Sequence, residues 1–290
     1  VPISARALGK ESQRDMLEDY VEHLLGLVAL SDIRKLKIVV DAGNGMAGHT
    51  APAVFKRINV EVTEMYYELD GTFPNHEANP IDEENLKDLK KMVKKKGADI
   101  GLAFDGDADR CFLVDENGSA VNPSLLTALI ADRELLKTPG STIIYNLISS
   151  KAVREIVEER GGKAIRSRVG HSYIKALMAE SGAIFGGEHS GHFYFSEFWR
   201  ADSGMLAALY ALSELGNSNT PTTFSSIIKK YRKYHGSGEI NSKVSDVKAA
   251  IEKVSQAFAE EGEIDRLDGL TINTQSWWLN VRASNTEPLL

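Results

Sequence analysis

Short apolar segments alternate with amphipathic segments of helical period along most of this chain, and no other feature restricts the fold as strongly. In the first unit, an apolar strand over residues 37–41 leads into the turn Asp41-Ala-Gly-Asn-Gly45 and then into a helix over 51–58. A strand, a glycine-rich turn and a helix in this order are typical of an α/β unit. The sequence therefore predicts an α/β protein.

The same pattern recurs further along the chain and then changes. We expect further helices over residues 12–30, 82–96, 123–136, 151–160, 172–181, 203–215 and 224–233. We expect further strands over residues 60–66, 98–104, 111–114, 142–145, 163–165, 183–185 and 193–195. After Tyr234 the expected order is a strand (239–244), a helix (247–260) and two strands (270–274 and 277–281), which is a small α+β pattern.

The charge balance bears on the class of ligand. The 290 residues carry 34 Lys and Arg against 41 Asp and Glu, which gives a net charge of −7. A nucleic-acid-binding surface usually needs a net basic face, so we predict no nucleic-acid partner. An anionic small molecule stays possible, because a local basic pocket can exist in an acidic protein.

The compartment is indicated by the single cysteine and by the apolar segments. Cys111 alone forms no internal disulfide and no thiolate metal cluster, which favours a reducing compartment and a cytoplasmic protein. The longest early apolar stretch, residues 24–30, is seven residues long and far short of the ~20 needed to span a bilayer. We therefore predict no membrane partner. The chain does not begin with Met, so residue 1 is not expected to be the natural start.

Three aspartates, Asp105, Asp107 and Asp109, alternate with small residues in the loop Asp105-Gly-Asp-Ala-Asp-Arg110. Carboxylates with this spacing in a tight loop converge on one point, and Mg²⁺ takes anionic oxygen ligands. Three unpaired carboxylates would repel one another, so we expect a bound cation if all of them stay ionised. Arg110 beside them favours an anionic group such as a phosphate.

Three other interpretations of this aspartate loop stay open. Its spacing matches part of an EF-hand with Glu116 at position 12, but Arg110 stands where that motif needs glycine and the flanks are predicted strands. Asp105 could be the nucleophile of an aspartyl phosphatase. The loop could also be a plain hairpin turn rich in Asp and Gly.

A second polar loop, Gly187-Glu-His-Ser-Gly-His192, joins two predicted strands. Glu188, Ser190 and His192 alternate and can point the same way. A carboxylate, a hydroxyl and an imidazole together suit a polyhydroxylated ligand, and His192 could act as a general base. A polar turn without a function is the alternative.

Basic residues mark two further segments. The segment Arg282-Ala-Ser-Asn-Thr-Glu-Pro288 offers a guanidinium, hydroxyls and turn amides that can cradle a phosphate, or it is a simple turn at a strand end. The segment Arg166-Ser-Arg168-Val-Gly-His171 places two cations before a helix and could bind an anion, although each basic residue could also be an ordinary surface residue.

The loops beginning at Asp105, Gly187 and Arg282, in this order, resemble those of the α-D-phosphohexomutases, specifically the bacterial phosphomannomutase/phosphoglucomutase group. The resemblance spans essentially the whole chain and covers domains two, three and most of four of a four-domain family. It implies two consecutive α/β domains with mixed sheets and then a small α+β C-terminal domain. The expected bounds are 1–119 with the metal loop, 120–232 with the sugar loop and 233–290 with the phosphate loop.

One family feature is not matched. The family's first domain carries a Thr-Ala-Ser-His-Asn-Pro type loop with the phosphorylated catalytic serine, and no such motif occurs in these 290 residues. The chain also stops before the family's last strand. We expect the natural protein to be longer and this chain to be inactive alone. A non-catalytic sugar-phosphate-binding remnant is the alternative.

The resemblance implies an isomerase that interconverts hexose 1-phosphate and hexose 6-phosphate through a phosphoserine enzyme and a 1,6-bisphosphate. One Mg²⁺ would be bound by the three aspartates, Arg110 would neutralise the transferred group, and glucose 1,6-bisphosphate or an equivalent would be the activator. Glu188 and Ser190 would hold sugar hydroxyls, while His192 and His171 would bind ligand or assist proton transfer. The phosphate that is not transferred would be held by Arg282, Ser284, Asn285 and Thr286.

Two positions bear on the choice of sugar. Family members that act on glucosamine phosphate tend to have Gln and Gly where this sequence has His189 and Asn285. The resemblance therefore favours mannose or glucose phosphates as the small-molecule partners. No oligomeric state is predicted.

Overall fold

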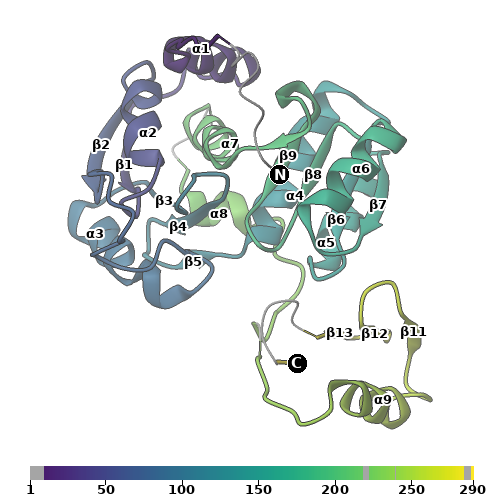
Figure 1. Ribbon diagram of the computed structural model, residues 1–290. Coiled ribbons are helices and arrows are strands. Elements are labelled where there is room, and N and C mark those ends of the chain that lie inside the picture. The colour runs from purple at the N-terminus through teal and green to yellow at the C-terminus, as the bar shows by residue number, and fades with distance from the viewer. Residues whose placement is uncertain (1–9, 218–221, 239, 284–288) are drawn as a thin grey trace.

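The computed structural model describes residues 10–217, 222–238, 240–283 and 289–290. Within them the strands form two five-stranded sheets and one three-stranded sheet (Figure 1). The two larger sheets contribute to one continuous hydrophobic core, and the small sheet belongs to a C-terminal unit. The structure thus confirms the predicted fold class, two consecutive α/β units with mixed sheets and then a small α+β unit.

The first sheet has the order β2-β1-β3-β4-β5, in which β2, β1 and β3 are parallel and β4 and β5 are antiparallel to their neighbours. Its strands are β1 (Leu36–Asp41), β2 (Val60–Met65), β3 (Ile100–Phe104), β4 (Cys111–Asp115) and β5 (Ala120–Val121). Its helices are α1 (Leu17–Leu27), α2 (Ala47–Phe55), η1 (Glu83–Leu86, a 3-10 helix) and α3 (Lys87–Lys96). Every residue of β3 and β4 is buried, so the loop between them projects from the centre of the sheet.

The second sheet repeats this plan with the order β10-β9-β8-β6-β7, in which β6 is parallel to β7 and β8. Its strands are β6 (Thr142–Asn146), β7 (Lys163–Ser167), β8 (Phe185–Gly187), β9 (Phe193–Phe195) and β10 (Ala201–Asp202). Its helices are α4 (Pro123–Lys137), α5 (Lys151–Glu159), α6 (His171–Ser181), η2 (Ser196–Phe198, a 3-10 helix), α7 (Gly204–Gly216) and α8 (Phe224–Lys229). In both sheets a parallel strand leads into an antiparallel hairpin, and each hairpin carries a polar loop.

The C-terminal unit corrects one expectation. It contains α9 (Val247–Ala257), β11 (Glu263–Asp265), β12 (Leu270–Asn273) and β13 (Trp278–Val281). The predicted strand over 239–244 is wrong, because the described residues 240–244 form only an isolated bridge between Lys243 and Leu289. The third strand is instead β11, a short and mostly polar segment that pairs with β12.

The helices form where one face is apolar. In α5 the buried residues Ala152, Val153, Ile156 and Val157 recur at i, i+1, i+4 and i+5, which places them on one side of the helix. α3 ends at Gly97, whose φ of 56° is the left-handed conformation that glycine adopts most easily. Among the helices in the described ranges, none is both long and apolar enough to cross a bilayer.

Helix α7 connects the two larger units and packs against the aspartate loop. It follows β10 of the second sheet, yet it contacts β4 of the first. A Cβ atom added at Gly204 would lie 2.5 Å from the carbonyl oxygen of Arg110. Only glycine therefore lets the first turn of α7 lie this close to the backbone of the aspartate loop.

Candidate functional site

The aspartate loop lies between β3 and β4. Asp105 directly follows β3 and is 2% exposed, Asp109 is half-buried and Asp107 is exposed. Ala108 has a φ of 63°, which turns the chain back toward β4. Ligand oxygens of the three aspartates all lie within 4.8 Å of one another, so the carboxylates converge as predicted.

Arg110 clamps the buried aspartate. Its backbone amide donates to Asp105 Oδ1 at 3.0 Å and its Nε donates to Asp105 Oδ2 at 2.7 Å. Its Nη1 donates to Asn79 Oδ1 at 3.1 Å. Burial raises the pKa of Asp105 to about 6, although the Arg110 charge and hydrogen bonds oppose that rise. The arginine thus supplies a positive charge at the base of the loop.

The aspartate loop fits a hard divalent cation. Asp109 Oδ1 is buried and accepts no hydrogen bond from the described part of the chain. Arg110 Nε is 3.8 Å from this oxygen, which is beyond hydrogen-bond distance. A buried carboxylate oxygen without a donor is costly unless a cation compensates it. Three carboxylates are also the ligand type that Mg²⁺ prefers.

A cleft of about 900 Å³ opens beside the aspartate loop. The segment 70–80 forms part of its wall. The lining residues are Phe73, Glu77, Ala78, Asn79, Asp105, Gly106, Asp107 and Arg110. This segment is anchored by His76, whose Nε2 lies 3.1 Å from Asp41 Oδ2. That hydrogen bond raises the pKa of His76 to about 9, against the opposite effect of burial.

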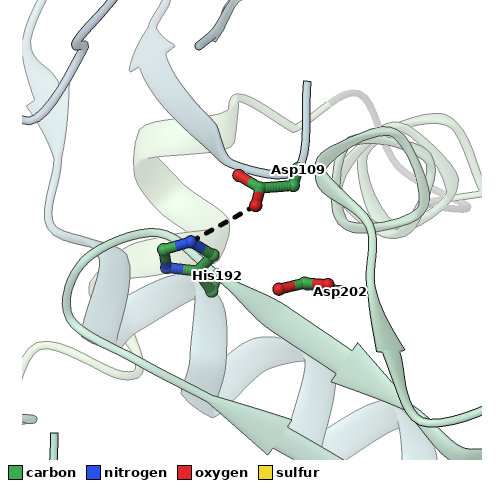
Figure 2. Close-up of side chains that lie close together, drawn as sticks. All are labelled: Asp109, His192 and Asp202. Carbon is green, nitrogen blue, oxygen red and sulfur yellow. Dashed lines mark ion pairs between the residues drawn. The ribbon is translucent and has the colours of Figure 1, made fainter. Parts of the chain in front are cut away.

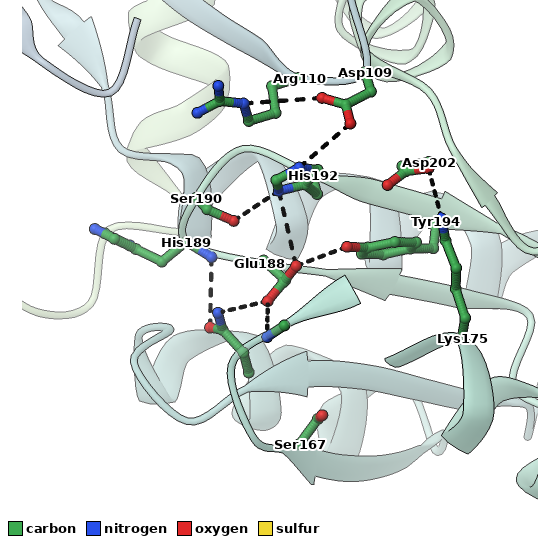
Figure 3. A network of polar contacts seen from close by, with 12 residues as sticks. Asp109, Arg110, Ser167, Lys175, Glu188, His189, Ser190, His192, Tyr194 and Asp202 are labelled. Atoms are coloured by element: carbon green, nitrogen blue, oxygen red, sulfur yellow. Dashed lines mark hydrogen bonds and ion pairs between the residues drawn. The ribbon is translucent and has the colours of Figure 1, made fainter. Parts of the chain in front are cut away.

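In the second polar loop, Glu188 is held from three sides and is 2% exposed. Its Oε1 accepts from the amide of Gly170 at 3.1 Å and from Asn146 Nδ2 at 3.3 Å. Its Oε2 accepts from the phenol of Tyr194 at 2.7 Å (Figure 3). These donors fix the orientation of the carboxylate. Tyr194 lies within a predicted strand and Asn146 directly follows one, and neither belongs to a motif that marks it.

The two polar loops meet at His192. Its Nε2 lies 3.5 Å from Asp109 Oδ2 (Figure 2), and its Nδ1 lies 2.9 Å from Ser190 Oγ. His192 and Arg110 also form an antiparallel β-bridge. Burial lowers the pKa of His192, but the hydrogen bond and charge of Asp109 outweigh it and the net pKa is raised. The second polar loop and the aspartate loop are thus in direct contact.

Sequence reasoning missed Asp202, which lies on the same side of the site. An oxygen of Asp202 lies within 4.8 Å of ligand atoms of Asp109 and His192 (Figure 2). Lys175 donates to Asp202 Oδ1 at 3.0 Å, and this ion pair connects α6 to β10 (Figure 3). A carboxylate two residues before a helix, as in Ala201-Asp-Ser-Gly204, gives no signal in the sequence that separates it from a helix cap.

In the segment 166–171 both arginines have partners within the chain. Arg166 forms an ion pair with Asp265 of the C-terminal unit, so its charge is already neutralised. Arg168 lies over the ring of Tyr173 at 4.9 Å. His171 is the first residue of α6, is exposed, and follows the glycine whose amide contacts Glu188.

For the phosphate loop the structure describes only part of the predicted set. Arg282 directly follows β13 and is half-buried. Ser284, Asn285 and Thr286 lie outside the described residues. The structure therefore brings the first two loops together and, of the segment 282–288, describes only Arg282 and Ala283.

Comparison with known families matches three consecutive segments that together make up most of the chain. Residues 18–118 match the model of phosphoglucomutase/phosphomannomutase α/β/α domain II, and residues 122–234 match domain III of the same family. Residues 239–290 match its C-terminal domain.

Curated relatives carry the corresponding names. The chain is 38% identical over 295 aligned residues to phosphomannomutase of Salmonella typhimurium, covering 100% of this chain and 64% of the relative. It is 40% identical over 276 residues to phosphomannomutase of Methanocaldococcus jannaschii, covering 95% of this chain and 60% of the relative. The chain thus spans less than two thirds of the length of these relatives.

Solved structures agree with this assignment. A phosphoglucomutase/phosphomannomutase family protein of Burkholderia thailandensis superposes with a TM-score of 0.83 at 33% identity, over 96% of this chain and 59% of that one. N-acetylphosphoglucosamine mutase of Aspergillus fumigatus, crystallised with GlcNAc-6P and magnesium, shares the fold with a TM-score of 0.56 at 13% identity, over 94% of this chain and 64% of that one. The family matches, the sequence relatives and the shared fold lead to one conclusion: this chain belongs to the phosphoglucomutase/phosphomannomutase family.

Proposed function

We propose that this chain supplies the metal-binding and sugar-binding parts of a phosphohexomutase, an isomerase that interconverts the 1-phosphate and 6-phosphate of mannose, glucose or both. The observation that carries the proposal is the contact between the two polar loops, where His192 Nε2 lies 3.5 Å from Asp109 Oδ2. A hexose phosphate bound there would meet a metal site and a sugar-binding carboxylate at once.

The aspartate loop would bind the reacting phosphate. Asp105, Asp107 and Asp109 would hold one Mg²⁺, which when bound would draw electron density from a phosphoryl group and stabilise its charge. The Nε of Arg110 is engaged by Asp105, so the arginine is oriented before ligand binds. Its positive charge at the wall of the cleft supports a role in neutralising a transferred phosphoryl group.

The sugar loop would bind the hexose. Glu188 keeps about one acceptor site beyond those that its three donors occupy, because an ionised carboxylate offers about four acceptor sites. That free site would accept from a sugar hydroxyl, and Ser190 would bind a further hydroxyl. His192, and His171 at the start of α6, would bind ligand or assist proton transfer.

Two further groups are needed for the reaction, a binding site for the second phosphate and a phosphoryl donor. We propose that Arg282, Ser284, Asn285 and Thr286 hold the phosphate that is not transferred. The phosphoryl group would come from a phosphoserine elsewhere in the protein, and a 1,6-bisphosphate would be the intermediate. An Aspergillus fumigatus N-acetylphosphoglucosamine mutase was crystallised with glucose 1,6-bisphosphate. We propose that this compound or an equivalent is the activator of the present protein.

We also propose the organisation that the sequence predicts, with domain bounds at 1–119, 120–232 and 233–290. The family matches at 18–118, 122–234 and 239–290 support these bounds. The buried single cysteine, Cys111, supports a reducing compartment, and we place the function in the cytoplasm.

The function is tested by incubating the purified longer protein with Mg²⁺, glucose 1,6-bisphosphate and mannose 1-phosphate or glucose 1-phosphate. We expect the corresponding 6-phosphate to form, and we expect residues 1–290 alone to bind sugar phosphate without turnover. Release of inorganic phosphate with no isomer would instead indicate a phosphatase. Both carboxylate oxygens of Asp105 accept hydrogen bonds from Arg110, which argues against Asp105 as the nucleophile of such a phosphatase. Binding without any conversion by the longer protein would contradict the mutase.

A further inference from the structure

Two consecutive backbone amides between β7 and α6 donate to carboxylates of two different units. The amide of Val169 donates to Asp268 Oδ2 at 3.1 Å, in the turn between β11 and β12 of the C-terminal unit. The next amide, that of Gly170, donates to Glu188 Oε1 at 3.1 Å. Only the φ and ψ angles of Val169 separate the two N–H groups, so a rotation of the Val169 backbone that follows the loss of one hydrogen bond also redirects the other N–H group.

Asp268 is itself held by its surroundings. Its carbonyl oxygen accepts from Asn280 Nδ2 at 3.0 Å, which fixes the turn against β13. Gly269 has a φ of 71°, and a Cβ there would lie 2.4 Å from Val281 O, so the turn packs tightly on the end of β13. The ion pair between Arg166 and Asp265 adds a second contact between the same two segments.

The amide that binds Glu188 belongs to a glycine in an unusual backbone conformation. Gly170 has φ 129° and ψ 134°, a conformation that residues with a Cβ rarely adopt, and α6 begins at the next residue, His171. A change in the direction of the Gly170 amide would remove one donor from Glu188, which is 2% exposed. The loss of a charge-assisted hydrogen bond from a buried carboxylate is costly, so the carboxylate would reorient to find another partner.

We infer that Asp268 is a positioning residue that orients Glu188 through the Val169–Gly170 backbone. The carboxylate that we assign to the sugar is therefore set by the docking of the C-terminal unit, which carries Arg282. This inference rests on the proposed function of Glu188. Sugar recognition in the second unit is strong only when the unit that carries the phosphate loop is docked.

The test compares two variants, each of which removes one contact between the segment 166–170 and the C-terminal unit. Asp268→Ala removes the acceptor of the Val169 amide, and Asp265→Ala removes the partner of Arg166. Amide hydrogen exchange at Gly170 reports the coupling without any ligand. We expect exchange to accelerate at least 10-fold in Asp268→Ala and to change less than 2-fold in Asp265→Ala. Equal acceleration in both variants would overturn the inference.

The second readout is binding of mannose 1-phosphate compared with inorganic phosphate, measured by calorimetry with Mg²⁺ present. We expect Asp268→Ala to weaken mannose 1-phosphate about 5- to 10-fold more than inorganic phosphate, and Asp265→Ala to leave this ratio unchanged. A general loosening of the C-terminal unit would weaken both ligands alike, and that result would contradict the inference. If the unmodified protein binds mannose 1-phosphate no more tightly than inorganic phosphate, the proposed function fails. The hydrogen-exchange measurement at Gly170 then still tests whether Asp268 positions Glu188.

Discussion

The imidazole Nε2 of His192 lies 3.5 Å from Oδ2 of Asp109, although the two residues belong to loops of different sheets. The antiparallel bridge between His192 and Arg110 fixes this approach through the backbone, and the amide of Cys111 donates to Gly191 O at 3.2 Å beside it. The aspartate loop and the second polar loop are therefore in contact before any ligand binds.

Removing the charge of Asp109 should weaken metal binding more than removing an exposed charge elsewhere in the same unit. Asp109→Asn leaves a neutral amide where a buried oxygen lacks a donor, so we expect Mg²⁺ affinity to fall at least about 10-fold, as for loss of a charged ligand. The control is Asp88→Asn, on the exposed side of α3. Calorimetric titration with Mg²⁺ measures both, and equal affinities would contradict the assignment.

Removing the hydroxyl of Tyr194 should weaken sugar-phosphate binding as well as lower stability. Tyr194 OH donates to Glu188 at 2.7 Å, and Tyr231 OH donates to the buried Asp132 at 2.8 Å. Tyr194→Phe and Tyr231→Phe should each lower the free energy of unfolding by about 1.5–3 kcal/mol, because each hydroxyl donates to a buried carboxylate. We expect only Tyr194→Phe to raise the KM for sugar phosphate, by about 5-fold if about 1 kcal/mol of positioning is lost. If both substitutions raise the KM, the result would contradict the claim that Tyr194 acts on sugar binding through Glu188.

The pair formed by His76 and Asp41 should make stability fall in alkaline solution. The folded pKa of His76 is raised to about 9, above its ordinary value of 6.5. The protonated pair therefore stabilises the fold fully below pH 6.5, and this contribution is lost as the pH rises through about 9. We expect the difference in unfolding free energy between the unmodified protein and His76→Gln to shrink by on the order of 1 kcal/mol between pH 6.5 and pH 9.5. A difference that stays constant with pH would show that the pair is not ionic.

Two glycine-to-alanine substitutions should have opposite signs. At Gly204 an added Cβ would lie 2.5 Å from Arg110 O, so Gly204→Ala should destabilise by about 1–3 kcal/mol and weaken Mg²⁺ binding by displacing the aspartate loop. At Gly26 in α1 no atom of the described chain lies within 4 Å of an added Cβ, so Gly26→Ala should stabilise by up to about 1 kcal/mol through helix propensity. Thermal unfolding and Mg²⁺ titration measure both. A destabilised Gly204→Ala variant with unchanged Mg²⁺ affinity would show that α7 does not position the loop.

The loops themselves could be predicted from the sequence because each has a local signal. Asp105 to Arg110 lie between two apolar strands, and Glu188 to His192 lie in a second hairpin, so the hairpins and their polar tips follow from the pattern. The contact between Arg110 and His192 could not be predicted, because it depends on how α7 packs against β4.

Residues without a local signal were missed for the same reason. Tyr194 and Asn146 are parts of ordinary strands, and only the tertiary fold directs them to Glu188. Arg166 was expected to be a possible anion ligand, but the C-terminal unit places Asp265 against it. The strand β11 was missed because Glu263-Ile-Asp265 is short and mostly polar, and pairing with β12 decides its conformation.

The central claim, that the aspartate loop and the sugar loop bind one ligand together, is tested most directly by a crystal structure of the protein with Mg²⁺ and mannose 1-phosphate. We predict a metal ion at about 2.1 Å from oxygens of Asp105, Asp107 and Asp109, with hexose hydroxyls within hydrogen-bond distance of Glu188. A hexose bound away from Glu188, or a metal bound away from the three aspartates, would contradict the claim.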